Sequence, residues 1–436
     1  MHDANDDLRA AAHAWADWAV DRAFDGPNDI GMSPPTVKAT TAITEAGLGH
    51  KEAWRVWTDE LAPANLAVDS TRFMAYLPIA PTPVATVFDM VVSASALGAE
   101  SWQEAAGAVH AENETLAWLA SEFGLPATAV GCFVSGGSAG NLSALAVARD
   151  RWRRRTGRRH AKAIVSAGTH SCVANALHLL DIEPLALPGQ LLDPATLKSI
   201  DMADVCVIVA TAGTTNAGLI DNLPAIAAIA KANDGWLHVD AAFGGGAALA
   251  PSMKDAFAGL GEADSIVVDP HKWLFGPLDC CALLYRDGHE ALATHRQHAS
   301  YLDSLYTTDV INPTDLAYHL TRRARGLPLW MSLAVHGVAA YRSAVEQTLA
   351  TTKRAAELVK QADHLELIME PLLSVLLVRR KGWGKTDYDA WCQKLQTAGT
   401  AFVVPTAWES ETVARFATLH PHVSLELFTE LFDSMK

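Results

Sequence analysis

Apolar positions from about residue 130 onward follow two alternating patterns. Short continuous apolar runs predict buried strands at "VGCFVS", "AKAIVSA", "DVCVIVAT", "GWLHVDAA" and "SIVVD". Apolar residues at helical spacing lie between them, in "LSALAVARDRW", "ANALHLL" and "LPAIAAIAKAN". Continuous apolar strands separated by helices are typical of a mostly parallel sheet that is covered on both faces. The central fold is therefore predicted to be α/β.

The two ends of the chain carry different patterns. Residues 7–24 have apolar residues at helical spacing, which predicts a helix that would expose two tryptophans unless it packs on its own domain or on a second subunit. The stretch "MAYLPIAPTPVATVFDMVV" predicts a proline-rich loop that leads into a helix. A long helix from about residue 328, followed by the strand-like runs "LELIMEPLLSVLLVRR" and "TVARFATL", predicts a small α+β domain.

These patterns predict a chain of three parts. Residues 1–70 form an N-terminal helical segment that packs on the partner subunit, residues 71–327 form a large α/β domain, and residues 328–436 form the small C-terminal domain.

Composition and charge exclude several classes of function. Half of the 436 residues are apolar and 19% are charged, as expected of a folded globular protein. The formal charge of −15 opposes nucleic-acid binding, which relies on Lys and Arg to neutralise phosphates. No apolar run approaches the ~20 residues that span a bilayer, and the acidic N-terminus does not resemble a signal peptide. We therefore expect a cytoplasmic protein without a membrane partner.

Cysteines and one basic run have ordinary explanations. The six cysteines lack CxxC spacing, which favours reduced core thiols over a metal site or disulfides. The run "RDRWRRRTGRRHAK" is interpreted as a solvated helix end rather than a binding patch.

Polar residues at predicted strand ends carry the candidate chemistry, because ligands of open α/β sheets bind beyond the carboxyl ends of the strands. In "CFVSGGSAGNLSAL" a glycine turn leads into a helix predicted to begin near Asn141, which would form a cradle for an anion. This turn itself contains no GKS, GKT or GxGxxG, which disfavours a nucleotide loop at this position. A plain strand-to-helix connection is the alternative.

Three further side chains follow predicted strands. Asp240 ends a buried strand, so a cation or strong donors should face it, unless it only caps a helix. Lys272 leaves the sheet after "SIVVD", where a partly apolar pocket would lower its basicity and suit a Schiff base; snorkelling to solvent is the alternative. His170, taken alone, is more simply a structural histidine. Together, an anion cradle, a carboxylate and a lysine match the needs of pyridoxal phosphate.

The ordered motifs "SGGSAGN", "THSCVAN", "ATAGTTNAGLIDNL", "HVDAAFGG", "DPHKWLF", "SYLD" and "YHLTRRARGLPLW" resemble those of group II pyridoxal-phosphate-dependent amino-acid decarboxylases. The resemblance runs from about residue 65 to 420, includes the separation of Asp240 and Lys272, and is closest to a bacterial branch of the aromatic-L-amino-acid decarboxylase-like enzymes. It implies a fold-type-I transferase fold, pyridoxal 5'-phosphate as cofactor, and a homodimer with shared active sites.

The resemblance also implies residue roles. Lys272 would bond to the cofactor aldehyde, Asp240 would pair with the ring nitrogen, and His170 would stack on the ring near the substrate carboxylate. Further cofactor contacts would come from Gly137, Ser138 and His271 at the phosphate, from Thr215 and Ala242 at the ring, and from Asp221 as a support. Asp269 stands where animal aromatic decarboxylases have asparagine, and its charge would repel the phosphate, so direct phosphate contact is not expected of it.

Catalysis would further involve a loop from Tyr301 to about residue 320. Tyr301 matches the family's proton-donating tyrosine, and closure of the loop would exclude water. Arg322 would organise the closed site, with a surface ion pair as the alternative.

The substrate pocket is predicted to be apolar. Tyr76, Ile79 and Pro81, with Trp102 from the partner subunit, favour tryptophan, phenylalanine or tyrosine, which would be converted to the amine and carbon dioxide. However, the aromatic enzymes usually have His-Pro where this chain reads "DSTRF", and Glu100 and Glu104 could serve a basic substrate such as diaminobutyrate. Decarboxylation of glutamate or aspartate also stays open.

Other activities on the same fold remain as alternatives. They are an aldehyde synthase, a transaminase and an inactive ligand-binding homologue. Tyr301 argues against the synthase, and intact Lys272 and Asp240 argue against the inactive homologue.

Overall fold

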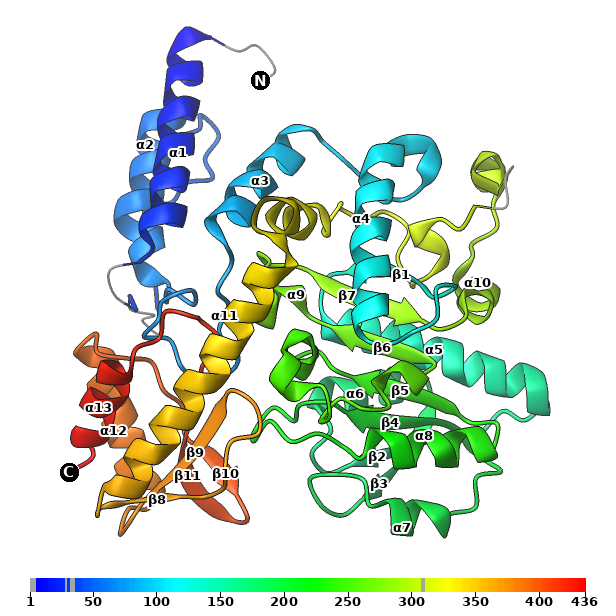
Figure 1. Ribbon diagram of the computed structural model, residues 1–436. Helices are drawn as coiled ribbons and strands as arrows, with labels where there is room; N and C mark the ends of the chain where they lie inside the picture. The colour runs from blue at the N-terminus through cyan, green and yellow to red at the C-terminus, as the bar shows by residue number, and fades with distance from the viewer. Residues whose placement is uncertain (1–4, 28–29, 32–35, 307–309) are drawn as a thin grey trace.

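A seven-stranded sheet forms the centre of the molecule in the computed structural model, which describes residues 5–27, 30–31, 36–306 and 310–436 (Figure 1). The strands are β1 (Val130–Val134), β2 (Ala161–Ser166), β3 (Ile182–Leu187), β4 (Val205–Thr211), β5 (Trp236–Asp240), β6 (Ser265–Val268) and β7 (Cys281–Tyr285). Their order is β1-β7-β6-β5-β4-β2-β3, and β7 is antiparallel to both of its neighbours while β2 to β6 pair in parallel. The predicted α/β class with a mostly parallel sheet is confirmed.

Helices cover both faces of this sheet. One face packs on α5 (Gly137–Thr156) and α6 (Ser171–Leu179), and the other on α4 (Trp102–Glu122) and α8 (Leu223–Ala232). Neighbouring residues of β4 show the alternation: Val207 packs in the hydrophobic core under α5 and α6, and Ile208 packs in the core on the opposite face. A strand buried on both faces must be apolar throughout, which explains its continuous apolar sequence.

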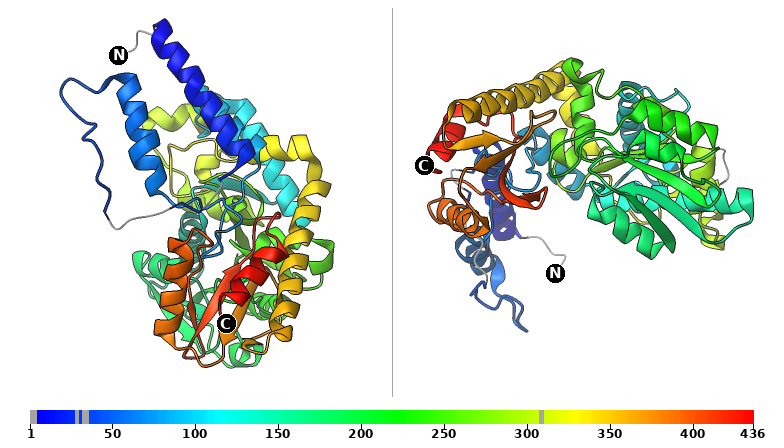
Figure 2. Two further views of the ribbon diagram at one scale, coloured as in Figure 1. Left: turned by 90° about the vertical axis from the view of Figure 1, so that its left-hand side faces the viewer. Right: turned by 90° about the horizontal axis from the view of Figure 1, so that it is seen from below.

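The C-terminal part has a core of its own. It contains α11 (Leu327–Gln361), α12 (Lys385–Thr397), α13 (Leu425–Asp433), and the strands β8 (Leu365–Leu367), β9 (Val375–Arg380), β10 (Thr406–Trp408) and β11 (Glu411–Ala417). The strands form an antiparallel sheet in the order β10-β11-β9-β8, as the smaller predicted α+β unit requires (Figure 2). Phe73 and Met74 pair with Phe402, so the segment before the large sheet is also anchored here.

The N-terminal helices stand away from the rest of the chain (Figure 2). They are α1 (Asp6–Asp25) and α2 (Gly49–Arg55), and α1 also contacts α3 (Pro83–Ala94), the helix predicted after the proline-rich loop. Trp15 and Trp18 pack against Trp54 of α2, with ring centroids 5.6 Å apart in both pairs. Even so, α1 has no buried residue within this chain. The predicted helix over residues 7–24 is confirmed, and its remaining exposure is consistent with a further contact surface.

Short elements complete the chain. They are α7 (Pro194–Lys198), α9 (Pro270–Trp273), α10 (Gly288–His295), the π-helix η1 (Val56–Leu61), and the 3-10 helices η2 (Ala62–Ala64), η3 (Gly244–Leu249), η4 (Pro251–Met253), η5 (Leu260–Glu262), η6 (Ser300–Tyr306) and η7 (Pro313–Asp315).

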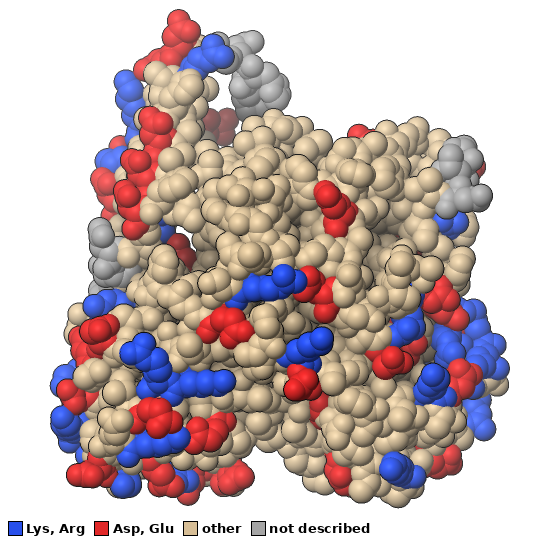
Figure 3. All heavy atoms as spheres, viewed as in Figure 1, with Lys and Arg blue, Asp and Glu red and all other residues tan. Residues whose placement is uncertain are grey.

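The basic run forms ion pairs at the end of α5. Arg151 pairs with Asp234, Arg154 with Glu290 and, just beyond the helix, Arg158 with Asp204. Figure 3 accordingly shows acidic side chains among the basic ones there. The predicted solvated helix end is confirmed. No helix in the described part of the chain is long and apolar enough to cross a bilayer.

Candidate active site

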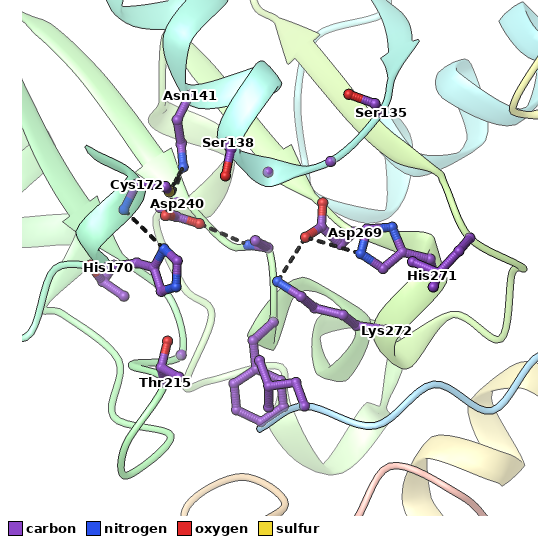
Figure 4. A pocket seen from close by; sticks show the side chains of 18 of the residues that line it. Ser135, Ser138, Asn141, His170, Cys172, Thr215, Asp240, Asp269, His271 and Lys272 are labelled. Carbon is purple, nitrogen blue, oxygen red and sulfur yellow. Dashed lines mark hydrogen bonds and ion pairs between the residues drawn. The ribbon is translucent and has the colours of Figure 1, made fainter. Parts of the chain in front are cut away.

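A cavity of about 310 Å³ opens at the carboxyl ends of the central strands (Figure 4). Its lining comes from segments that follow β1, β2, β4, β5 and β6, together with Leu77 and Leu278. The lining residues are Leu77, Ser135, Gly136, Gly137, Ser138, Asn141, Gly168, His170, Cys172, Thr211, Gly213, Thr215, Asp240, Ala242, Phe243, Asp269, His271, Lys272 and Leu278. Because β5 and β6 are parallel neighbours, Asp240 and Lys272 leave the sheet at the same edge.

The glycine turn forms one wall. Helix α5 begins at Gly137, not near Asn141 as predicted, so its first turn lies directly against the cavity. A Cβ on Gly137 would lie 3.1 Å from the Cβ of Ala242 and 3.2 Å from Oδ2 of Asp269, so a larger residue would crowd the wall. The first backbone N–H groups of a helix have no partners within the helix, and they favour an anion.

Asp240 is buried beside this turn, with 6% of its surface exposed. Its Oδ2 accepts a hydrogen bond of 3.0 Å from Nδ2 of Asn141, and its Oδ1 accepts one of 3.1 Å from the backbone N–H of Ala242. The sequence predicted that a cation or strong hydrogen-bond donors should face this buried carboxylate, and the structure shows donors. The carboxylate also lines the cavity, where a cationic group of a ligand can reach it.

Lys272 forms an ion pair inside the cavity. Its Nζ lies 2.7 Å from Oδ2 of Asp269, the residue that follows β6 and precedes α9. Burial lowers the pKa of Lys272, but the charge of Asp269, its hydrogen bond and the charge of Asp240 outweigh burial, and the pKa is raised overall. The predicted lowered basicity is therefore wrong for this environment, because two carboxylates stabilise the ammonium form.

Two histidines border the same space. His271 Nδ1 lies 2.7 Å from the carbonyl oxygen of Cys280, and burial lowers the pKa of His271 against the opposing charge of Asp269. His170 is the N-cap residue of α6, and its Nδ1 accepts a hydrogen bond of 3.2 Å from the backbone N–H of Cys172. The His170 ring lies across the cavity from Lys272 (Figure 4).

Thr215 and Asp221 occupy different positions. Thr215 lines the cavity, and its carbonyl oxygen accepts a hydrogen bond of 3.1 Å from Nε of Arg415. Burial lowers the pKa of Arg415 to about 10. Asp221 lies outside the lining and accepts hydrogen bonds of 2.7 Å from the backbone N–H groups of Leu192 and Thr211, and burial raises its pKa to about 6. It can therefore support the end of β4 but does not reach the cavity.

The residues predicted to contact the substrate do not line the cavity of this chain. Tyr76 is exposed beside Phe73 and Phe402, Ile79 is half-buried and does not line the cavity, and Pro81 lines a separate cavity. Instead, Leu77, Phe243 and Leu278 supply the apolar part of the lining.

The remaining predicted residues also lie elsewhere. The Trp102 indole donates to the carbonyl oxygen of Ile311 at 3.3 Å, and Tyr301 in η6 is 72% exposed. Residues 307–309 of the predicted loop lie outside the described residues.

Arg322 has a different environment from the one predicted. Its side chain is fully buried, and its guanidinium donates to both carboxylate oxygens of Glu112 at 2.7 and 3.0 Å and to the carbonyl oxygen of Phe133. This is neither the surface ion pair held as the alternative nor a cavity position. Within the chain, Arg322 joins the segment after η7 to α4 and β1.

Sequence reasoning did not single out Asn141 or Cys172 as site residues. Asn141 is fully buried and lies one helical turn after Gly137, which places it on the cavity side of α5. The sequence contains a signal for this position: Asn141 follows Gly137 by four residues, and residues at that spacing lie on the same face of a helix.

The residues present fit pyridoxal phosphate. A buried carboxylate suits a ring N–H, a lysine suits an aldehyde, and a helix start crowded against added side chains suits a phosphate. Asp269 borders the same wall, but its Oδ2 is paired with Nζ of Lys272 at 2.7 Å, so the ammonium group offsets the negative charge of this carboxylate.

Comparisons with known proteins agree with this fit. A sequence model described as the pyridoxal-dependent decarboxylase conserved domain matches residues 57–381. The chain is 29% identical to an aromatic-L-amino-acid decarboxylase of Bacillus atrophaeus, over 96% of this chain and 93% of that protein. It is 31% identical to an L-2,4-diaminobutyrate decarboxylase of Rhizobium meliloti, over 85% of this chain and 78% of that protein.

A solved structure supports the same assignment. The crystal structure of Oryza sativa TDC with PLP and tryptamine superposes with a TM-score of 0.89 and 25% sequence identity, covering 100% of this chain and 99% of that chain. The predicted family, fold type and cofactor are confirmed: the chain belongs to the pyridoxal-dependent decarboxylases, and its cofactor is pyridoxal phosphate.

Proposed function

We propose that this enzyme decarboxylates an aromatic L-amino acid to the corresponding amine. The observation that carries the proposal is one cavity in which Lys272 and Asp240 stand beside an apolar lining of Leu77, Phe243 and Leu278. An apolar lining favours a hydrophobic side chain over a charged one, because burial of an unpaired charge is costly.

The cofactor and the chain divide the chemistry between them. When bound, pyridoxal phosphate supplies an electron-accepting ring that stabilises the negative charge left at the α-carbon as carbon dioxide leaves. Lys272 supplies the amine for covalent attachment, Asp240 holds a proton at the ring nitrogen, and Gly137 and Ser138 bind the phosphate. Ala242 and Thr215 contact the ring, and His271 contacts the phosphate.

Orientation and proton transfer are the remaining tasks of the chain. His170 faces the cavity from the opposite wall and holds the substrate carboxylate where its bond can break. Tyr301 delivers the proton to the α-carbon. Because Tyr301 is exposed and outside the cavity of its own chain, this role requires either loop closure or delivery into the cavity of a partner subunit.

A homodimer completes the proposed site. Helix α1 has no buried residue within its own chain, and Phe24 at its end is exposed, so its apolar positions are available to a partner. Trp102 lies outside its own cavity, as expected of a residue that serves the neighbouring subunit.

A basic substrate is the second candidate because of the diaminobutyrate decarboxylase relative. The two glutamates that could recognise an ammonium group have other partners within the chain: Glu100 accepts from the backbone N–H of Arg322 at 3.0 Å, and Glu104 accepts from Ser101 at 3.1 Å. Like Trp102, neither glutamate lines the cavity of its own chain. The hydrogen bonds that already occupy both glutamates favour the aromatic substrate.

Carbon dioxide release from a panel of L-amino acids tests the proposal. The panel contains tryptophan, phenylalanine, tyrosine, 2,4-diaminobutyrate, glutamate and aspartate, with cofactor-saturated protein and the Lys272→Ala variant as the blank. We expect the highest kcat/KM with an aromatic acid. A preference for diaminobutyrate or an acidic substrate would overturn the aromatic assignment, and no release with any substrate would indicate an inactive homologue.

A further inference from the structure

Polar side chains line up behind Asp240 in an otherwise apolar layer. Trp236, His238 and Asp240 alternate along β5, so all three point to the face that α5 covers. His238 and its neighbour Ser265 on β6 are completely buried. Buried polar groups are retained only where they are hydrogen-bonded, so their partners show what they hold in place.

The partners form a continuous chain that ends at Asp240. The Trp236 indole N–H donates to Oγ of Ser265 at 2.9 Å, and Oγ of Ser265 lies 2.8 Å from Nδ1 of His238. Nε2 of His238 lies 2.7 Å from Oδ1 of Asn141, whose Nδ2 donates to Oδ2 of Asp240 at 3.0 Å.

The direction of these hydrogen bonds follows from donor and acceptor chemistry. Asn141 Oδ1 can only accept, so Nε2 of His238 carries a hydrogen. Burial lowers the pKa of His238 to about 4, so the ring is neutral near pH 7 and Nδ1 accepts from Ser265. Ser265 receives its own hydrogen bond from Trp236, whose indole can only donate. Every donor therefore points toward Asp240.

The second N–H of Asn141 confirms the amide orientation. Its Nδ2 also lies 3.3 Å from Sγ of Cys172, so both amide hydrogens have acceptors. With the amide rotated by half a turn, Oδ1 of Asn141 would face the carboxylate of Asp240, which is a repulsive contact.

We propose that the chain Trp236–Ser265–His238–Asn141 is a positioning device that keeps an amide donor on Asp240 and thereby keeps the proton of the adjacent cofactor nitrogen on the ring. This inference rests on the proposed role of Asp240. The N–H donor of Asn141 on Oδ2 stabilises the charged form of the Asp240 carboxylate. A charged carboxylate in turn stabilises a protonated ring nitrogen. Removal of the His238 donor leaves Oδ1 of Asn141 without its partner and weakens the hold on the amide donor, so that the carboxylate of Asp240 competes more strongly for the proton.

The test uses holoenzyme loaded with pyridoxal phosphate labelled with ¹⁵N in the ring. His238→Leu removes the donor at nearly the same volume, whereas His238→Gln keeps an N–H that can reach Asn141. The ring ¹⁵N chemical shift should report a protonated nitrogen in the wild type and His238→Gln, and a shift toward the unprotonated value in His238→Leu. The cofactor dissociation constant should rise about tenfold in His238→Leu, as expected for the loss of one charge-assisted hydrogen bond.

Ser265→Ala serves as the second variant should His238→Leu fail to fold. It removes the donor to Nδ1, which frees the other tautomer of His238, and it should move the ¹⁵N shift in the same direction. Wild-type shifts in folded His238→Leu or Ser265→Ala with cofactor bound would overturn the positioning role alone. An unprotonated ring nitrogen in the wild type would instead overturn the proposed role of Asp240.

Discussion

Lys272 and Asp269 form an ion pair of 2.7 Å at the edge of the cavity, three residues apart in the chain. Asp269 follows β6 as the N-cap residue of α9, and Lys272 lies in that short helix, so the local chain geometry itself brings the two charges together. The carboxylate raises the pKa of Lys272 against the opposing effect of burial. Asp269 therefore sets, in part, the pH at which Lys272 loses its proton.

Asp269→Asn should therefore lower the pKa of Lys272. The neutral amine is the form that attacks an aldehyde, so a lower pKa increases its fraction near neutral pH. The rate of covalent cofactor attachment to cofactor-free protein, followed by absorbance across a pH series, should reach its midpoint at a lower pH than in the wild type. The exposed Asp255→Asn serves as control. A midpoint that stays in place or moves upward would contradict the role of the ion pair.

Arg322→Met should cost about 3 to 5 kcal/mol of stability, because it leaves the buried charge of Glu112 without its partner. Arg379→Met is the matched control: Arg379 pairs with Glu366 and Glu411 at the surface, where an ion pair contributes roughly 0 to 1 kcal/mol. Thermal unfolding of the two variants with saturating cofactor measures the difference. Equal losses of stability in both variants would show that the buried Arg322–Glu112 pair contributes no more than a surface ion pair.

Much of the fold could be predicted because burial on both faces forces continuous apolar strands. The run at residues 205–211 is one example, and the parallel arrangement then explains why Asp240 and Lys272 meet. The insertion of antiparallel β7 between β1 and β6 could not be predicted in this way, because "CALLY" reads as one more apolar strand whose neighbours depend on tertiary packing.

The environment of individual site residues was less accessible from sequence. Arg322 and Glu112 are far apart in the chain, so only the folded structure shows that they neutralise each other. The basicity of Lys272 likewise depends on where the carboxylate of Asp269 points, which residue spacing alone does not determine. Strand alternation, in contrast, already places His238 and Asp240 on one face, and the buried chain behind Asp240 could have been suspected from "WLHVD".

Tyr301→Phe should divert part of the product from amine to aldehyde. Without the hydroxyl proton, the reacting carbon is exposed to oxygen, and one substrate, one O₂ and one water would give aldehyde, carbon dioxide, ammonia and hydrogen peroxide. Amine, ammonia and peroxide are measured in parallel. Tyr318→Phe, at another exposed tyrosine of the same region, is the control and should retain the wild-type ratio. An unchanged amine yield in Tyr301→Phe would show that the proton comes from elsewhere.

His238 should make the stability of the protein depend on pH. Burial lowers its pKa to about 4 in the folded chain, whereas an unfolded histidine titrates near about 6.5. Between these values the unfolded chain binds a proton that the folded chain does not, so this contribution to stability is present above pH ~6.5 and is lost as the pH falls toward ~4. The wild type should lose about 2 kcal/mol from this source between pH 7 and pH 5, and His238→Gln should not.

Thermal unfolding of both proteins at the two pH values measures the difference, with the exposed His289→Gln as control. Parallel losses in wild type and His238→Gln would mean that folding does not lower the pKa of His238, and the neutral ring from which the direction of the hydrogen bonds was derived would have to be revised.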